Sequence, residues 1–107
     1  MSERKLDMEK DAYVYFMTNK NHNVLYLGVT SDLRRCVREH KIDVSKENFA
    51  SMYNCRKLVF FEHMANMKDA FARQRQLKNW KRQWKNELIE KQNPGWMDLS
   101  ESWVEPY

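Results

Sequence analysis

Apolar and aromatic residues gather in two short runs near the start of the chain, separated by a polar turn. Residues 13–17 and 24–27 form these runs, and their β-branched and aromatic composition is typical of strands with one buried face. Residues 19–23 include three asparagines, which tolerate the left-handed conformations of turns. The pattern predicts a β-hairpin, and pairing that is symmetric about this turn places Tyr15 opposite Tyr26 on one face.

Two later segments have helical periodicity. A helix is expected over residues 32–41, after a cap at Ser31 or Asp32. Its inward stripe comprises Leu33, Cys36, Val37 and His40, and its outer face carries Arg34, Arg35, Arg38 and Lys41. A second helix opens with Asn66 as its cap and Asp69 three residues later, which is close to a capping box. Its predicted inward stripe comprises Met67, Ala70, Phe71, Gln74 and Leu77.

A third strand and a third helix complete the pattern. Residues 56–63 include an apolar run on both faces, so this strand is expected to be central or covered. The last helix starts near Trp80 and places Trp80, Trp84 and Leu88 on one face. This spacing indicates that both indoles belong to the core rather than to a base-stacking platform. The helix ends before the breaker pair Pro94-Gly95.

The order β-β-α-β-α-α predicts an α+β fold, a small three-stranded antiparallel sheet flanked by helices. With 107 residues, 42% of them hydrophobic, the chain has material for one domain. We expect residues 1–11 to form a flexible tail, residues 12–93 the domain, and residues 94–107 a C-terminal tail that packs on the domain or on a partner.

Charge and cysteine content add to this picture. The net charge of +4 and the isoelectric point near 9.1 mildly favour polyanionic partners. No apolar run reaches the length of a membrane span, and two cysteines without a secretion signal suit free thiols. We therefore expect a cytoplasmic protein without a membrane partner.

Two tyrosine motifs point to a known family. YVY at residues 13–15 and, ten residues later, YLG at residues 26–28 resemble the half-motifs of the GIY-YIG endonuclease superfamily. Three later segments also resemble small stand-alone bacterial proteins related to the UvrC N-terminal nuclease domain: DLRRCVREHK, YNCRKLVFFE and AFARQRQLKNWKRQWKNELIEKQNPGW. The UvrC domain acts in DNA repair as part of an excinuclease. The resemblance covers roughly residues 12–100. The family fold is likewise a three-stranded antiparallel sheet flanked by helices.

The resemblance implies phosphodiester cleavage with one divalent metal ion, Mg²⁺ or Mn²⁺. In the family a helix glutamate holds the metal, a tyrosine of the second half-motif lies beside the attacking water, and a helix arginine steadies the phosphate. Tyr15 and Tyr26 match the motif tyrosines, and the family often has histidine at His40, so these three are the candidate catalytic residues. The alternative for either tyrosine is a strand aromatic in the core. Gly28 is expected to end the second strand where backbone can approach a ligand.

Two positions depart from the family pattern. The family arginine falls eight residues after the motif glycine, where this chain has Cys36, and the adjacent Arg35 points about 100° away on a helix. The metal-binding glutamate is replaced by Gln74, which lacks the charge that holds a hard divalent cation. We therefore expect a scaffold whose cleavage is weakened or lost, and we assign no metal ligand. The alternative is an active nuclease in which Glu62 or Glu39 supplies a substitute carboxylate.

Basic residues carry a second functional hypothesis, the binding of DNA or another structured nucleic acid. Cations attract phosphates without a metal, and acidic residues are sparse between positions 70 and 86. The alternative is a solvated face with i, i+4 pairing. The expected binding set is Gly28, Arg34, Arg35, Arg38, Tyr53, Arg73 and Lys78.

Two other hypotheses have less support. Zinc ligation by Cys36, His40, Cys55 and His63 is disfavoured because their spacings match no usual zinc module. Cys55 is instead expected to be a small buried hydrophobe. A pure interaction module, such as a homodimer, would use the tail residues Trp96, Met97, Trp103 and Tyr107.

Overall fold

The computed structural model describes residues 11–42 and 54–103, and the structural statements below concern these residues. Residues 1–10 of the expected N-terminal tail, Tyr53 and Tyr107 lie outside them. The elements are β1 (Ala12–Thr18), β2 (Leu25–Thr30), α2 (Leu33–Ile42), β3 (Lys57–Met64), α4 (Met67–Lys78) and α5 (Arg82–Gln92). This order confirms the expected α+β fold. None of the described helices is long and apolar enough to cross a membrane.

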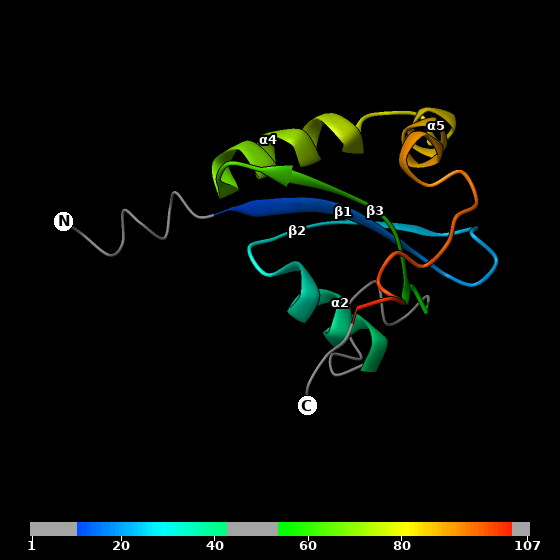
Figure 1. The fold of residues 1–107 in the computed structure, drawn as a ribbon. Helices are drawn as coiled ribbons and strands as arrows, with labels where there is room; N and C mark the ends of the chain where they lie inside the picture. Colours follow the sequence, from blue (N-terminus) through cyan, green and yellow to red (C-terminus); the bar gives the residue numbers. More distant parts are fainter. Residues whose placement is uncertain (1–10, 43–53, 104–107) are drawn as a thin grey trace.

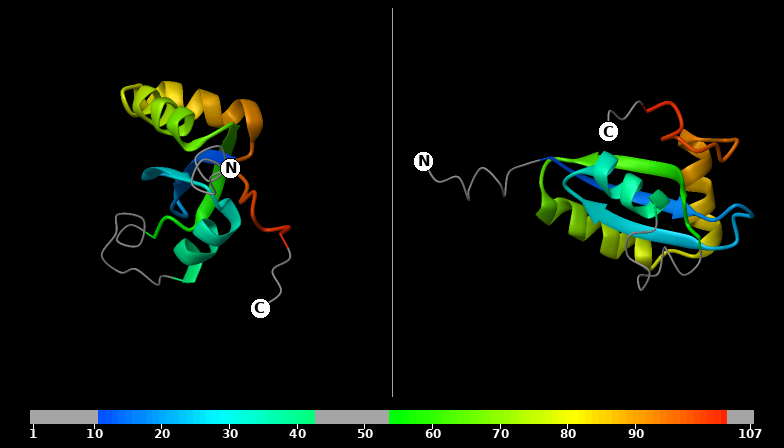
Figure 2. Two further views of the ribbon diagram at one scale, coloured as in Figure 1. Left: turned by 90° about the vertical axis from the view of Figure 1, so that its left-hand side faces the viewer. Right: turned by 90° about the horizontal axis from the view of Figure 1, so that it is seen from below.

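The sheet separates two layers of helix. Its strands are antiparallel in the order β2-β1-β3, with α4 and α5 over one face and α2 against the other (Figures 1 and 2). Because side chains alternate along β1, Val14 and Phe16 join the core under α4 and α5, whereas Tyr15 and Met17 join the core under α2. The candidate tyrosine Tyr15 therefore belongs to the α2 layer.

The hairpin register differs from the symmetric pairing expected. Tyr15 pairs with Gly28, and Tyr26 pairs with Met17, so the two tyrosines are diagonal neighbours on one face. Asn19 holds the loop closed in this register, since its side chain accepts a hydrogen bond from Val24 N–H and its carbonyl accepts one from His22 N–H. Gly28 consequently lies inside β2 and does not end it.

The stripes predicted for the first two helices are largely confirmed. In α2, Leu33, Val37 and His40 are buried. In α4, Asn66 caps the first turn by accepting a hydrogen bond from Asp69 N at 2.8 Å, as expected. The predicted inward position of Phe71 is wrong, because 46% of its surface is exposed.

The last helix differs more from the prediction. It begins at Arg82, after Trp80, and Ile89 is its buried residue. The prediction that both indoles belong to the core is wrong for Trp84, because 48% of its surface is exposed. The buried line of α5 continues instead to Asn93, whose amide donates to the carbonyls of Val59 and Met97.

Strand β3 is covered, as expected, but it is an edge strand rather than a central one. Residues after α4 bind the backbone of β3. Leu58 donates its N–H to the Asp98 carboxylate and accepts from Leu99 N. Phe61 donates to and accepts from the side-chain amide of Gln92. The last residue of α5 and the segment after it thereby engage backbone groups of Leu58 and Phe61 that β3 would otherwise present at its outer edge.

Candidate active site

The centre of the candidate site is the hydroxyl of Tyr15, buried between β1 and α2. It lies 2.9 Å from Cys36 Sγ and 3.3 Å from His40 Nε2, within hydrogen-bonding distance of both. The ring of Tyr26 lies 6.1 Å from that of Tyr15 and 5.1 Å from that of His40, measured between centroids. The structure therefore brings together the three candidate catalytic residues and places Cys36 in direct contact with one of them.

Gly28 makes this arrangement possible. A Cβ atom at position 28 would lie 2.4 Å from Cζ and Oη of Tyr15, far closer than real Cβ contacts. Glycine is required because the Tyr15 ring lies directly over the backbone of β2. The space above Gly28 that was expected to admit a ligand is occupied on this face by the Tyr15 ring.

The cluster is uncharged near neutral pH. Burial raises the pKa of Tyr15, and the nearby Cys36 raises it further. Burial also raises the pKa values of Tyr26 and Cys36, although the hydrogen bond from Tyr15 opposes the shift at Cys36. Burial lowers the pKa of His40. The cluster therefore consists of two phenols, a thiol and a neutral imidazole, none of which carries a charge.

Gln74 lies on the opposite side of the sheet from this cluster, next to the edge strand β2. Its side-chain N–H donates to the carbonyl of Leu27 at 3.5 Å. Gln74 also lines a groove of about 240 Å³ along β2, together with Leu25, Tyr26, Leu27, Lys78 and Lys85. Tyr26 thus contacts the cluster through its ring and also lines the groove.

The basic residues of the expected binding set differ in what they contact. Arg73 is held by Glu62, with Nε 2.7 Å from the carboxylate, and by the Trp80 ring at 5.6 Å. Arg35 pairs with Glu39 on the exposed face of α2 at 3.1 Å. Arg34 lies 4.7 Å above the Trp103 ring, and Arg38 is half-buried. Lys78 is the member of the set that lines the groove.

Lys85, a basic residue outside the expected binding set, lines the groove too. It belongs to the basic run of residues 73–85, but no local pattern shows that α5 crosses back towards β2. Only the packing of α5 against the sheet brings Lys78 and Lys85 together.

The described residues do not fit a hard divalent cation at the Gln74 position. Such ions are held by carboxylates, whereas Gln74 offers a neutral amide whose N–H already donates a hydrogen bond to the Leu27 carbonyl. Among the residues described, no group of three or more His, Cys, Asp and Glu is placed to hold a metal. Both substitute carboxylates are engaged, Glu62 with Arg73 and Glu39 with Arg35. Cys55 is fully buried, as expected of a small hydrophobe.

Comparisons with known proteins bear on this arrangement. The model of the GIY-YIG catalytic domain matches residues 11–87. No curated protein gives a significant sequence match. The solution NMR structure of the UPF0213 protein BH0048 from Bacillus halodurans is similar, with a TM-score of 0.50 and 20% identity over 88% of this chain and 99% of that one. At this identity the similarity concerns the fold alone.

Proposed function

The chain belongs to the GIY-YIG catalytic domain family, and from that premise we propose that it binds DNA or another structured nucleic acid while cleaving it weakly or not at all. The observation that carries the proposal is the uncharged cluster at Tyr15. Its hydroxyl contacts the Cys36 thiol at 2.9 Å, at the position where the family motif has a phosphate-binding arginine. The scaffold is retained, and the charge that the reaction requires is missing.

The energetic cost of these changes is large. Losing one preorganised donor to a transition state typically lowers the rate by ~10²–10³. Cys36 cannot replace the arginine, since burial raises its pKa and it remains a neutral thiol. Gln74 removes the carboxylate that would hold the metal, and this loss acts on the same step, so the two effects are not additive. The two changes together favour a scaffold that has lost most of its cleavage chemistry.

A nuclease rebuilt around another carboxylate is the competing proposal. Glu62 would have to release Arg73, to which it is joined at 2.7 Å in a half-buried pair. Glu39 lies on the exposed face of α2 with Arg35. Breaking a partly buried ion pair to bind a metal leaves the guanidinium uncompensated, which disfavours this route. The degenerate site is therefore the preferred hypothesis.

Binding without cleavage is supported by the groove along β2. Lys78 and Lys85 line it beside Tyr26, and both can contact phosphates without a metal. The sequence blocks that resemble small relatives of the UvrC nuclease domain make branched or damaged DNA the first substrates to test. We expect affinity to fall as the salt concentration rises, because phosphate contacts release counterions.

A supercoiled-plasmid nicking assay tests the catalytic half of the proposal. The parent protein is compared with Cys36→Arg/Gln74→Glu, with Mg²⁺ or Mn²⁺ and a chelator control. We expect nicking by the double variant alone. Chelator-sensitive nicking by the parent at the rate of the double variant would refute the degenerate site, and Glu62→Gln would then identify the replacement ligand.

A salt titration of DNA binding tests the other half. Lys78→Ala and Lys85→Ala are each expected to weaken binding and to make it less dependent on salt. The exposed Lys68 lies at the opposite end of α4, and Lys68→Ala is the matched control. Affinity that does not change with salt, or that falls equally in all three variants, would contradict the proposed binding surface.

A further inference from the structure

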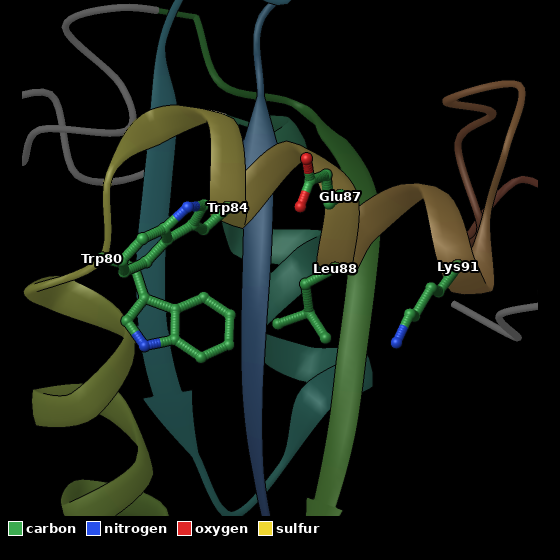
Figure 3. A pocket seen from close by; sticks show the side chains of 5 residues that line it. All are labelled: Trp80, Trp84, Glu87, Leu88 and Lys91. Atoms are coloured by element: carbon green, nitrogen blue, oxygen red, sulfur yellow. The ribbon is translucent and has the colours of Figure 1, made fainter.

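The half-exposed indole of Trp84 belongs to an open pocket that the proposed cleavage site does not use. The pocket has a volume of about 330 Å³ and is lined by Trp80, Trp84, Glu87, Leu88 and Lys91 (Figure 3). This volume is at the lower end of the ~300–1,000 Å³ typical of small-ligand sites. Figure 3 shows the two indoles together at one end, Leu88 in the middle and Lys91 at the other end.

The geometry of the indoles suits a flat ring. Trp80 and Trp84 meet edge to face, with centroids 6.2 Å apart and planes at 84°. A planar ligand can therefore stack on one indole while its edge meets the other. The Glu87 carboxylate lines the same pocket and can accept a hydrogen bond from an amino group on the ligand.

The charge around the pocket excludes a cationic ligand as the favoured occupant. Arg73, which is paired with Glu62, lies 5.6 Å from the Trp80 ring, and Lys81 lies 5.7 Å from the Trp84 ring, so each indole already has a cation near it. Lys91 lines the pocket as well, against a single carboxylate, Glu87. Positive charge around the pocket favours a ligand with a neutral ring and an attached phosphate.

We infer that this pocket receives an unpaired nucleobase, which stacks on Trp84 while the adjoining phosphates contact the surrounding lysines. Helix α5 contributes to both sites, since Trp84 lines the pocket and Lys85 lines the β2 groove, so a strand that crosses α5 can contact both. Bases inside a duplex are already stacked, and only a single-stranded or extruded base can enter. The inference rests on the proposed nucleic-acid binding and specifies it: the protein prefers nucleic acid with unpaired bases.

Fluorescence anisotropy with a labelled single strand, and with the fully paired duplex of the same sequence, tests the inference. Stacking of one base on an aromatic side chain contributes ~1–3 kcal/mol, so Trp84→Ala is expected to weaken single-strand binding by about 5- to 150-fold. Duplex binding is expected to change less than twofold. Trp84→Phe retains an aromatic face and is expected to keep most of the affinity.

Phe71→Ala is the matched control. Phe71 is an aromatic residue on α4 with 46% exposure, similar to Trp84, but it does not line the pocket. It is expected to change neither affinity more than twofold. In the parent protein, 2-aminopurine placed in the single strand is expected to lose emission on binding, as a stacked base does, and to lose less with Trp84→Ala.

Three results would overturn the inference. Unchanged single-strand binding by Trp84→Ala, or equal loss on single strand and duplex, refutes the pocket while leaving the proposed function standing. If the parent binds neither form in a salt-dependent manner, the proposed function and the inference fail together. If choline shifts the Trp84 indole N–H resonance and a deoxynucleotide does not, the pocket binds a cation instead.

Discussion

Substituting Gly28 by alanine tests whether close packing between β2 and Tyr15 holds the site together. The new Cβ would lie 2.4 Å from Cζ and Oη of Tyr15 and 2.8 Å from Cε1, where ordinary contacts begin near 3.4 Å. The overlap is therefore about 1 Å, and it involves a rigid ring rather than the end of a flexible chain. The ring must move, since the backbone of β2 is fixed by its pairing with β1.

The expected cost has two parts. Overpacking of this kind typically costs ~1–3 kcal/mol. Movement of the ring by about 1 Å also breaks the contacts of the Tyr15 hydroxyl with Cys36 and His40, at ~1 kcal/mol each. We therefore expect the free energy of unfolding to fall by ~3–5 kcal/mol, a large fraction of the stability of a small domain.

Urea denaturation measures this free energy, and Gly95→Ala is the matched control. A Cβ at Gly95 would meet Met97 at 3.6 Å, an ordinary contact, so this change is expected to be neutral or to stabilise by ~0.4–1 kcal/mol. In a Tyr15→Leu background, which removes the ring, the cost of Gly28→Ala should largely disappear. A Gly28→Ala protein within ~0.5 kcal/mol of the parent would refute the packing argument.

Three further predictions concern stability. Burial lowers the pKa of His40, so the unfolded chain takes up a proton at a higher pH than the native state does. The stability present above about pH 6.5 should therefore be lost as the pH falls below that value. A urea midpoint at pH 5 equal to that at pH 7.5 would contradict this. Asp98→Ala leaves Leu58 N–H without its acceptor and should cost ~1–3 kcal/mol, with Asp98→Asn costing less; equal midpoints for the two variants would count against it. Asn66→Ala removes the α4 cap and should cost ~1 kcal/mol, whereas Asn66→Asp should not, and the thermal midpoints of the two will show whether the cap contributes.

The sequence was sufficient for the order of elements, because each element carries its own periodicity or cap. The stripe of α2 and the Asn66 cap depend on spacings of three and four residues, which are local. The diagonal placement of Tyr15 and Tyr26 depends on how the Asn19 side chain closes the hairpin loop. That hydrogen bond is a matter of three-dimensional geometry, and the residue spacing alone did not reveal it.

The sequence predicted which residues form the site, but it did not predict their burial or their protonation states. Tyr15, Tyr26 and His40 could be named from the motif, whereas their neutral protonation states follow from burial under α2. The exposure of Trp84 was missed because the stripe was counted from Trp80, which precedes α5. The buried residues Ile89 and Asn93 are four residues apart, whereas Trp84 is five residues before Ile89 and so points about 140° away from it.

The attachment of the C-terminal segment to β3 has a consequence for how copies of the protein can associate. An open sheet edge is a template for strand addition, and natural proteins block such edges to avoid aggregation. Gln92, Asp98 and Leu99 engage the backbone of Leu58 and Phe61 in β3, so strand addition by another chain is hindered over this part of the edge. Removing residues 94–107 would expose this template, and the truncated protein should form sheet-extended oligomers instead of a well-behaved smaller domain. The C-terminal segment thus limits self-association through the β3 edge.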